Sequence, residues 1–265
     1  MLPKLTVAAQ LFGCRAYTQT VEGIENTFKR ISEDGYVSAQ VSGFGPIAPE
    51  KLRDIAQGYG VGVCVTHSSF DRMLTDLDSM IAEHRMWGCK NIGIGSMPAK
   101  YHGGLDGLYA FIADINPIAK RLEAEGMHLT YHNHNFEFVK YDGRTLMDRL
   151  IEDSDPALNF IIDTYWVQAG GANPSDYIRK VAGRMEVVHF KDMAIVKGEK
   201  GLEMRFAPVG EGNIDFSEAL RACVAAGVEY IAIEQDDCYG RSPFDCLAIS
   251  RKNTIKLAEG IACMR

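Results

Sequence analysis

The densest group of side chains able to bind metal or transfer protons lies in YHNHNFEF, residues 131–138. This stretch holds two histidines, two asparagines and a glutamate, directly after the more apolar MHLT of residues 127–130. Imidazole and carboxylate groups bind divalent ions and transfer protons near neutral pH. The stretch is either a solvated loop or one wall of an active site, and the remaining strand ends distinguish these alternatives.

Other residues of the same type follow separate apolar runs. His67 follows VGVCVT, Asp163 follows LNFII, His189 lies inside MEVVHF, and Glu234 follows EYIAI. In a barrel of parallel strands the C-terminal strand ends meet at one face, where catalytic groups gather. We therefore expect Glu137, beyond the two histidines of the first stretch, to converge with these residues.

Each of these residues also has a purely structural explanation. An Asp at a strand end often caps the next helix, but no helix is expected directly after Asp163, and a lone histidine such as His189 often sits satisfied in the core. Burying the Glu234 carboxylate after an apolar strand would cost free energy unless a cation paired with it. Taken together, Glu137, Asp163, His189 and Glu234 predict a metal site. Three carboxylates and one imidazole favour Mn²⁺, with Mg²⁺, Co²⁺ or Zn²⁺ as further candidates.

Short, nearly continuous apolar runs must position these groups. Such runs are typical of strands buried on both faces. They occupy residues 5–10, 37–42, 61–66, 91–95, 128–131, 158–162, 185–190 and 229–233. Helical segments are expected between them at 49–59, 71–87, 104–125, from 174, 215–226 and 244–261, with proline, capping-box and glycine signals at several ends.

Eight strands alternating with about eight helices predict a parallel sheet. The 265 residues match one (β/α)₈ TIM barrel of roughly 250 residues, so we predict a single α/β domain over 1–265. The alternative, an open doubly wound sheet, usually carries a glycine-rich nucleotide loop after its first strand. Here that strand is followed by LFGCRAYTQT, which lacks this loop.

The amino-acid composition limits the classes of binding partner and the cellular compartment that we expect. The net charge of −7 disfavours binding to nucleic acid, whose phosphates an acidic surface repels. No apolar run reaches the roughly 20 residues that span a membrane. The seven cysteines form no C-x-x-C pair and are odd in number, which indicates reduced thiols and a cytoplasmic protein.

Five motifs carry a family resemblance: YHNHNFEF, IDTYWVQAGGANP, VVHFKDM, FAPVGEGNIDF and YIAIEQD. Together they resemble the sugar phosphate isomerase/epimerase family with the xylose isomerase-like TIM barrel. The resemblance is close over the second half of the chain and extends to strand order in the first. It implies a divalent metal held by Glu137, Asp163, His189 and Glu234, with one or two of the glutamates also moving protons.

The chain departs from the ketose 3-epimerases of this superfamily at the fifth strand. Those enzymes carry a metal-binding glutamate on the strand itself, where this chain has Tyr131 and His132. Either Glu137 is the ligand, or His132 or His134 replaces it and Glu137 contacts substrate. The nuclease branch of the superfamily is disfavoured, because Trp166 stands where a zinc-binding histidine is expected.

The resemblance implies proton abstraction next to a carbonyl through a metal-stabilised enediolate. We predict an isomerase or epimerase acting on a small keto-sugar or sugar phosphate. A lyase or dehydratase of the inosose dehydratase or 3-keto-glycoside type is the alternative, and a non-catalytic sugar-binding barrel is less favoured. The acid–base candidates are Glu137, Glu234 and His134.

A second group of residues is expected to contact substrate: His67, His132, Trp166, Lys191 and Arg205. Phe12 is a further candidate for the pocket wall. The segment Ala194–Arg205 is expected to be a long charged loop that closes over the substrate or touches a neighbouring subunit. A homodimer or higher homo-oligomer is therefore a further expectation.

Overall fold

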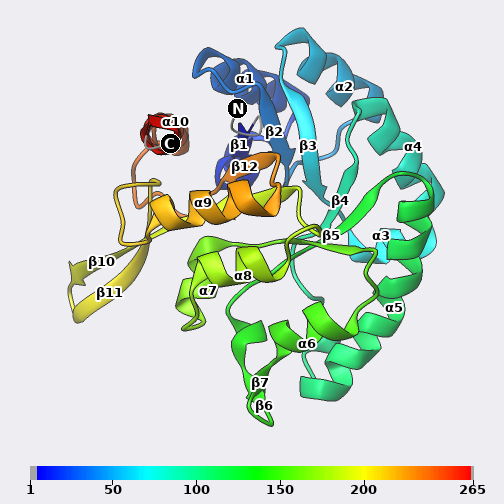
Figure 1. The fold of residues 1–265 in the computed structure, drawn as a ribbon. Helices are drawn as coiled ribbons and strands as arrows, with labels where there is room; N and C mark the ends of the chain where they lie inside the picture. The colour runs from blue at the N-terminus through cyan, green and yellow to red at the C-terminus, as the bar shows by residue number, and fades with distance from the viewer. Residues whose placement is uncertain (1–4, 264–265) are drawn as a thin grey trace.

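A computed structural model describes residues 5–263, and its main feature is an eight-stranded parallel sheet curled into a barrel (Figure 1). Neighbouring strands follow the order β8-β5-β4-β3-β2-β1-β12-β9. A parallel bridge between Asp163 and His189 joins the two outer strands, so the barrel closes. The strands are β1 (Thr6–Gln10), β2 (Ser38–Val41), β3 (Gly62–His67), β4 (Asn91–Ile94), β5 (His128–His132), β8 (Leu158–Ile161), β9 (Val187–Phe190) and β12 (Tyr230–Ile233).

The strands form as predicted because both of their faces are buried. Inside the barrel, small and branched side chains such as Ala8, Val65 and Ala232 pack against one another. Outside it, a larger apolar layer fills the space between sheet and helices. The predicted (β/α)₈ barrel is confirmed, and its C-terminal strand ends share one rim.

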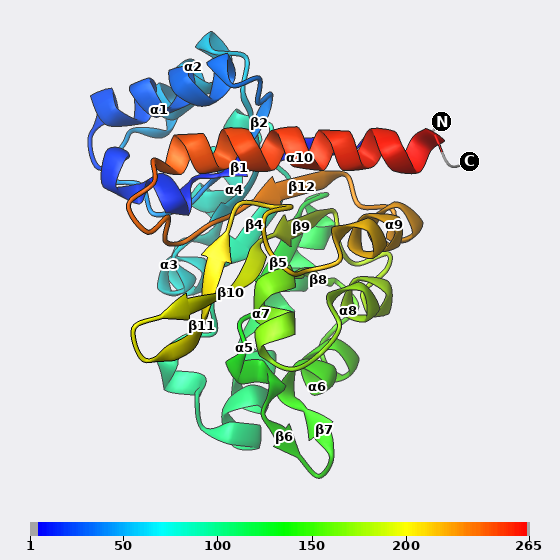
Figure 2. The same cartoon turned by 90° about the vertical axis from the view of Figure 1, so that its left-hand side faces the viewer.

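Helices surround the barrel (Figures 1 and 2). They are α1 (Val21–Glu33), α2 (Pro49–Gly58), α3 (Phe70–Thr75), α4 (Leu77–Trp87), α5 (Gly104–Ala124), α6 (Leu146–Asp153), α7 (Thr164–Ala169), α8 (Pro174–Lys180), α9 (Phe216–Ala226) and α10 (Pro243–Cys263). Asn173 and Asp215 cap α8 and α9 through their side chains, as the sequence signals indicate. Within residues 5–263, none of these helices has the length and apolarity required to cross a lipid bilayer.

The segment 71–87, predicted as one helix, is two helices. Asp76 separates α3 from α4 with backbone angles φ −147° and ψ 46°, outside the helical range. Its carboxylate accepts a hydrogen bond from Arg72 Nε at 3.2 Å. Aspartate bonds readily to nearby groups in non-helical conformations, so it favours helix ends over interiors.

The expected loop at Ala194–Arg205 is instead an antiparallel hairpin of β10 (Asp192–Gly198) and β11 (Gly201–Ala207). It projects from the barrel as an arm (Figures 1 and 2). Apolar residues alternate with polar ones here, and Gly201 supplies a φ of 131° at the turn, which explains the strands. A second small hairpin, β6 (Lys140–Tyr141) with β7 (Arg144–Thr145), lies before α6.

His84 on α4 forms a hydrogen bond with Thr66 near the end of β3. Its buried ring places Nε2 2.8 Å from Thr66 Oγ1, and Nδ1 2.8 Å from the Met80 carbonyl oxygen. Burial lowers the pKa of His84 to about 4, against an ordinary value of 6.5. The folded protein therefore holds this imidazole neutral at pH 7.

The buried His84 predicts a pH-dependent stability. As the pH falls below 6.5, His84 becomes protonated in the unfolded chain, whereas in the folded protein it stays neutral down to about pH 4. The stabilisation is complete above pH 6.5 and is lost between these values, by about 3 kcal/mol. His84→Gln should remove this component, so urea unfolding from about pH 7.5 to about pH 4 should show a wild-type advantage that shrinks with acidity. A pH-independent advantage would contradict the assignment.

Candidate active site

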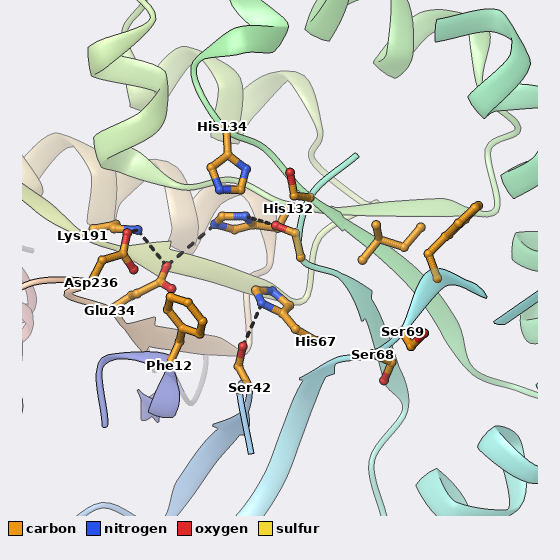
Figure 3. Close-up of a pocket in the computed structure, with 15 residues that line it drawn as sticks. Phe12, Ser42, His67, Ser68, Ser69, His132, His134, Lys191, Glu234 and Asp236 are labelled. Atoms are coloured by element: carbon orange, nitrogen blue, oxygen red, sulfur yellow. Dashed lines mark hydrogen bonds and ion pairs between the residues drawn. The ribbon is translucent and has the colours of Figure 1, made fainter. Parts of the chain in front are cut away.

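A cavity of about 470 Å³ opens at the C-terminal ends of the strands (Figure 3). Its lining comes from strands far apart in sequence, including Phe12 after β1, His67 at the end of β3, His132 of β5, Lys191 after β9 and Glu234 after β12. The volume suits a small molecule.

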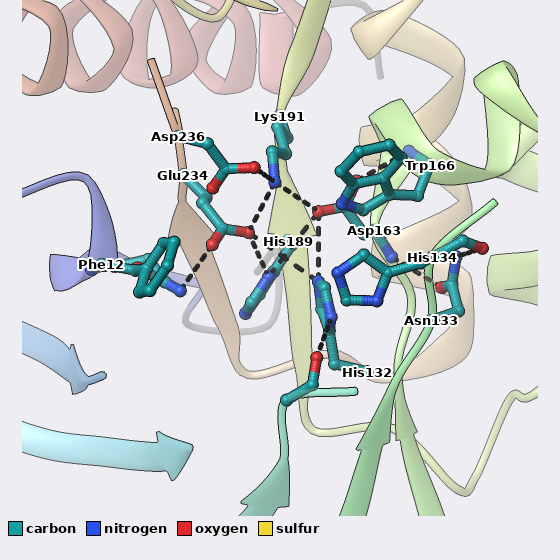
Figure 4. Close-up of polar contacts among 12 residues, drawn as sticks. Phe12, His132, Asn133, His134, Asp163, Trp166, His189, Lys191, Glu234 and Asp236 are labelled. Atoms are coloured by element: carbon teal, nitrogen blue, oxygen red, sulfur yellow. Dashed lines mark hydrogen bonds and ion pairs between the residues drawn. The ribbon is translucent and has the colours of Figure 1, made fainter. Parts of the chain in front are cut away.

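Four buried side chains meet beside this cavity: His132, Asp163, His189 and Glu234. Each contributes one ligand-type atom, and these atoms all lie within 4.8 Å of one another. His132 Nε2 is 3.2 Å from Asp163 Oδ2, and His189 Nδ1 is 2.9 Å from Glu234 Oε2 (Figure 4). The set has two imidazole nitrogens and two carboxylates.

The outward-facing ring nitrogens of both histidines have acceptor partners. His132 Nδ1 lies 3.0 Å from the Gly95 carbonyl oxygen, and His189 Nε2 lies 2.7 Å from Gln40 Oε1. The inner nitrogens face the carboxylates of Asp163 and Glu234, so each ring lies between two acceptors. With its one proton on the outer nitrogen, a neutral ring would turn a lone pair toward the cluster. Two lone pairs and two carboxylates facing one point fit a divalent cation, so this chemistry supports the cluster as a metal site.

Local charges control protonation in the cluster. Burial lowers the pKa of His189. Burial acts the same way on His132, but the hydrogen bond and charge of Asp163 outweigh it and raise the pKa of His132. Burial opposes ionisation of Glu234, yet Lys191 and His189 hold the pKa of Glu234 well below its usual range. Glu234 is therefore a carboxylate at neutral pH.

Lys191 is a buried cation among carboxylates. Its Nζ lies 2.6 Å from Asp236, 3.3 Å from Glu234 and 3.6 Å from Asp163. Burial alone would lower the pKa of Lys191, but these carboxylates raise it. The ammonium also lies 5.0 Å from the centre of the Trp166 ring. Lys191 thus stays charged, and its ion pairs with the three carboxylates stabilise one wall of the cavity.

Glu137 lies apart from the cluster, against the expectation that it binds the metal. Its buried carboxylate accepts hydrogen bonds from the Tyr131 hydroxyl at 2.5 Å and the His134 backbone N–H at 2.9 Å. Burial raises its pKa. Strand β5 ends at His132, and a 3₁₀ turn follows at Phe136–Phe138. This turn places the Glu137 side chain against Tyr131 of β5. His132, the alternative ligand, occupies the place in the cluster.

Asp163 caps a helix after all. Helix α7 begins at the next residue, and Asp163 Oδ1 accepts the Trp166 backbone N–H at 2.9 Å. The expectation that no helix follows was wrong. Its other oxygen, Oδ2, faces His132 and Lys191. One carboxylate therefore serves the helix and the cluster together, which orients it firmly.

The expected substrate contacts separate into two groups. His67, His132 and Lys191 line the cavity, and Trp166 packs beside His134 with ring centres 5.1 Å apart. Among residues 5–263, two of these side chains have buried nitrogens without a hydrogen-bond partner, His67 Nε2 and Trp166 Nε1, and so does the neighbouring His134 at Nδ1. Such atoms normally have partners, so they are available to a bound molecule.

Arg205 and His134 differ from their expected roles. Arg205 lies on the β10–β11 hairpin, paired with Glu203 at 2.9 Å and above the Tyr239 ring, away from the cavity lining. Burial lowers the pKa of His134 to about 3. A neutral, weakly basic His134 suits binding of a substrate hydroxyl better than proton abstraction.

Three residues that contact the cluster or line the cavity were not identified from the sequence. Gln10 donates to Glu234 Oε1 at 2.6 Å, and Gln40 accepts from His189. Asp236 lines the cavity beside Lys191. The sequence places Gln10 at the end of the first apolar run, Gln40 inside the second, and Asp236 two residues beyond Glu234.

Comparison with known proteins decides the family. The model described as Xylose isomerase-like TIM barrel matches residues 21–237. The chain belongs to this family. An inosose dehydratase from Salmonella typhimurium is 24% identical over 258 residues, covering 81% of this chain and 83% of that protein. One from Clostridium beijerinckii is 29% identical over 160 residues, which span 54% of this chain and 53% of that relative.

Solved structures of the family share the fold. A sugar phosphate isomerase/epimerase from Parabacteroides distasonis superimposes with a TM-score of 0.74 at 18% identity, covering 94% of this chain and 93% of that one. A xylose isomerase-like TIM barrel protein from Mycobacterium smegmatis in complex with magnesium gives 0.72 at 13% identity, covering 96% of both chains. Relatives and neighbours with named activities are enzymes, and on this basis we identify this protein as an enzyme.

The cluster predicts how metal binding responds to mutation. Asp163→Asn should weaken binding of Mn²⁺ by more than about 100-fold, since it removes a charged ligand, whereas Glu137→Gln should weaken it less than about tenfold. Titration calorimetry with metal-stripped protein measures both. Equal losses in the two variants would restore Glu137 to the ligand set.

The buried cation predicts a stability effect. Lys191→Met leaves three carboxylates facing one another, and should cost about 3–5 kcal/mol of unfolding free energy in metal-free protein. Excess Mn²⁺ should recover part of this loss. The matched variant Lys180→Met, which breaks an exposed pair with Asp148, should cost less than about 1 kcal/mol. Similar urea midpoints for the two variants would contradict the role of Lys191.

Proposed function

We propose that this protein is a metal-dependent dehydratase that removes water from an uncharged keto-sugar or inosose. The hydrogen leaves the carbon next to the carbonyl, and the hydroxyl leaves the following carbon. The observation that carries this proposal is that the ionised acid–base groups gather on one wall of the cavity. Lys191, Glu234 and Asp236 come from the ends of β9 and β12.

The other wall supports this choice. The ends of β2, β3 and β4 contribute Ser42, His67, Ser68 and Ser96. Burial and the nearby His132 and His189 lower the pKa of His67 well below its ordinary value, so it is a poor base. Epimerisation requires proton exchange on both faces of one carbon, whereas elimination proceeds with groups on a single wall.

The metal site completes the proposed chemistry. His132, Asp163, His189 and Glu234 would hold the divalent ion. When bound, such an ion supplies Lewis-acid polarisation of the substrate carbonyl. With two nitrogen and two oxygen ligands, the donor set no longer favours Mn²⁺ over Co²⁺ or Zn²⁺ as strongly as the three-carboxylate set expected from sequence.

The protein's own groups then move the protons. Asp236, whose pKa burial and the nearby Glu234 raise to about 6, accepts the proton from the carbon as the C–H bond breaks and the new C=C bond forms. Lys191 delivers a proton to the departing oxygen as the C–O bond breaks, which releases water, and regains one from Asp236, 2.6 Å away. Gln10 steadies Glu234, and His134 and Trp166 offer their free N–H or lone-pair groups to substrate hydroxyls.

The isomerase or epimerase predicted from sequence remains the second candidate. Solved proteins named as isomerase/epimerase share this fold, and the same cluster can stabilise an enediolate. The inosose dehydratases among the relatives are an independent reason for placing dehydration first.

Product analysis separates the two candidates. Mn²⁺-loaded protein is incubated with neutral keto-sugars and inososes in D₂O. Dehydration predicts a product lighter by one water with the ultraviolet absorbance of a conjugated enone. A product of unchanged formula carrying deuterium at the reacting carbon would instead establish epimerisation or isomerisation.

Variants test the assigned groups. Asp236→Asn should lower kcat by about 10²–10⁴, the usual contribution of a positioned acid or base, whereas Glu234→Gln should lower kcat together with the metal content. Glu137→Gln, which alters a carboxylate outside the cluster, is the matched control and should keep kcat within about tenfold. Metal content is measured for every variant, so that loss of the ion is distinguished from loss of proton transfer.

A further inference from the structure

A chain of hydrogen bonds links helix α4, outside the cavity, to Ser68 in the hydroxyl-bearing wall of the cavity. Ser68 lines the cavity just beyond β3 (Figure 3). Its Oγ lies 2.7 Å from Thr66 Oγ1, which lies 2.8 Å from His84 Nε2. His84 Nδ1 in turn lies 2.8 Å from the Met80 carbonyl oxygen on α4. A buried helix histidine is thus linked to a residue that lines the cavity.

The direction of every bond in this chain follows from its last member. A carbonyl oxygen only accepts, so His84 Nδ1 carries the ring proton and Nε2 is a lone pair. Thr66 therefore donates its hydroxyl hydrogen to Nε2. With that hydrogen committed, Thr66 can only accept from Ser68, so Ser68 donates its hydrogen away from the cavity.

The neutral state of His84 is essential to this order. Burial lowers the pKa of His84 to about 4. A protonated ring would donate from Nε2 and reverse both hydroxyls. Above that range the order is fixed, and Ser68 has only oxygen lone pairs left for a ligand.

We propose that the His84–Thr66–Ser68 relay makes Ser68 an obligate hydrogen-bond acceptor that selects a hydroxyl group of an uncharged substrate. The selection is against carbonyl, fluorine or phosphate at that position, because their lone pairs would face those of Ser68. This inference rests on the proposed function for the ligand class and extends it to a specificity-determining residue.

The charge of the cavity agrees with this selection. Among the described residues that line it, Lys191 is the only lysine or arginine, and three carboxylates already surround its ammonium. The wall formed by Ser42, Ser68 and Ser96 offers hydroxyl groups and no cation. A phosphate placed there would lose its hydration without gaining an ionic partner.

The relay itself is tested without any ligand. The ¹⁵N shifts of the His84 ring report which nitrogen carries the proton. We expect Nδ1–H at pH 7, and the same tautomer in Thr66→Val, because the Met80 carbonyl still accepts from Nδ1. The ¹⁵N shift of Nε2 should change in that variant, which removes the hydroxyl donor to Nε2. A ring protonated on Nε2 in the wild type overturns the proposal, whether or not the protein turns over any substrate.

Selection is tested by binding of myo-inositol, a neutral polyol without the reactive carbonyl, and of its single deoxyfluoro analogues. At one ring position wild type should bind the fluoro compound at least about tenfold more weakly. That penalty should fall to less than about threefold in Ser68→Ala, and should shrink in Thr66→Val, where Ser68 is free to turn its O–H toward the ligand. The matched variant Thr75→Val, on α3 away from the cavity, should behave as wild type.

The outcomes separate this inference from the proposed function. A penalty that is independent of Ser68 and Thr66 at every ring position overturns the relay. Tighter binding of myo-inositol 1-phosphate than of myo-inositol, or no binding of the neutral ring, also overturns it. If the expected tautomer and penalties appear but no keto-sugar loses water, the relay stands and the dehydratase assignment fails.

Discussion

The structure of the site depends on how the barrel accommodates negative charge in its buried rim. Asp163 and Glu234 are buried carboxylates, and isolated charges there would be very costly. Lys191 offsets part of that cost. The inner nitrogens of His132 and His189 face these carboxylates, so the cluster favours a further positive charge, which a proton or a bound cation would supply. A divalent ion satisfies this requirement.

The barrel makes this concentration of charge possible because each group sits on a different strand and is anchored from outside. Asp163 is held by the first turn of α7, His189 by Gln40 of β2, and Glu234 by Gln10 of β1. These contacts fix the side chains before any ligand arrives. The result divides the cavity into an ionised wall from the late strands and a hydroxyl-bearing wall from the early ones.

Much of this could be predicted from sequence because strand ends in a parallel barrel converge. The apolar runs located all eight strands, and Asp163 and Glu234 were recognisable as polar groups directly after two of them, with His189 inside a third. Glu137 was misplaced because its position depends on the turn after Asn133, which strand periodicity does not describe. Gln10 and Gln40 were missed because a glutamine gains its role only through partners on distant strands. The β10–β11 hairpin was read as a loop because its charges obscured a short alternating pattern.

The central claim is that His132 and His189, with Asp163 and Glu234, form the metal site. X-ray absorption spectroscopy of Mn²⁺- or Zn²⁺-loaded protein tests it most directly, since imidazole rings give a distinct multiple-scattering signal. The account predicts two imidazole ligands in the wild type and one in His132→Ala, with Glu137→Gln unchanged. A single imidazole in the wild type, together with a changed spectrum in Glu137→Gln, would contradict it.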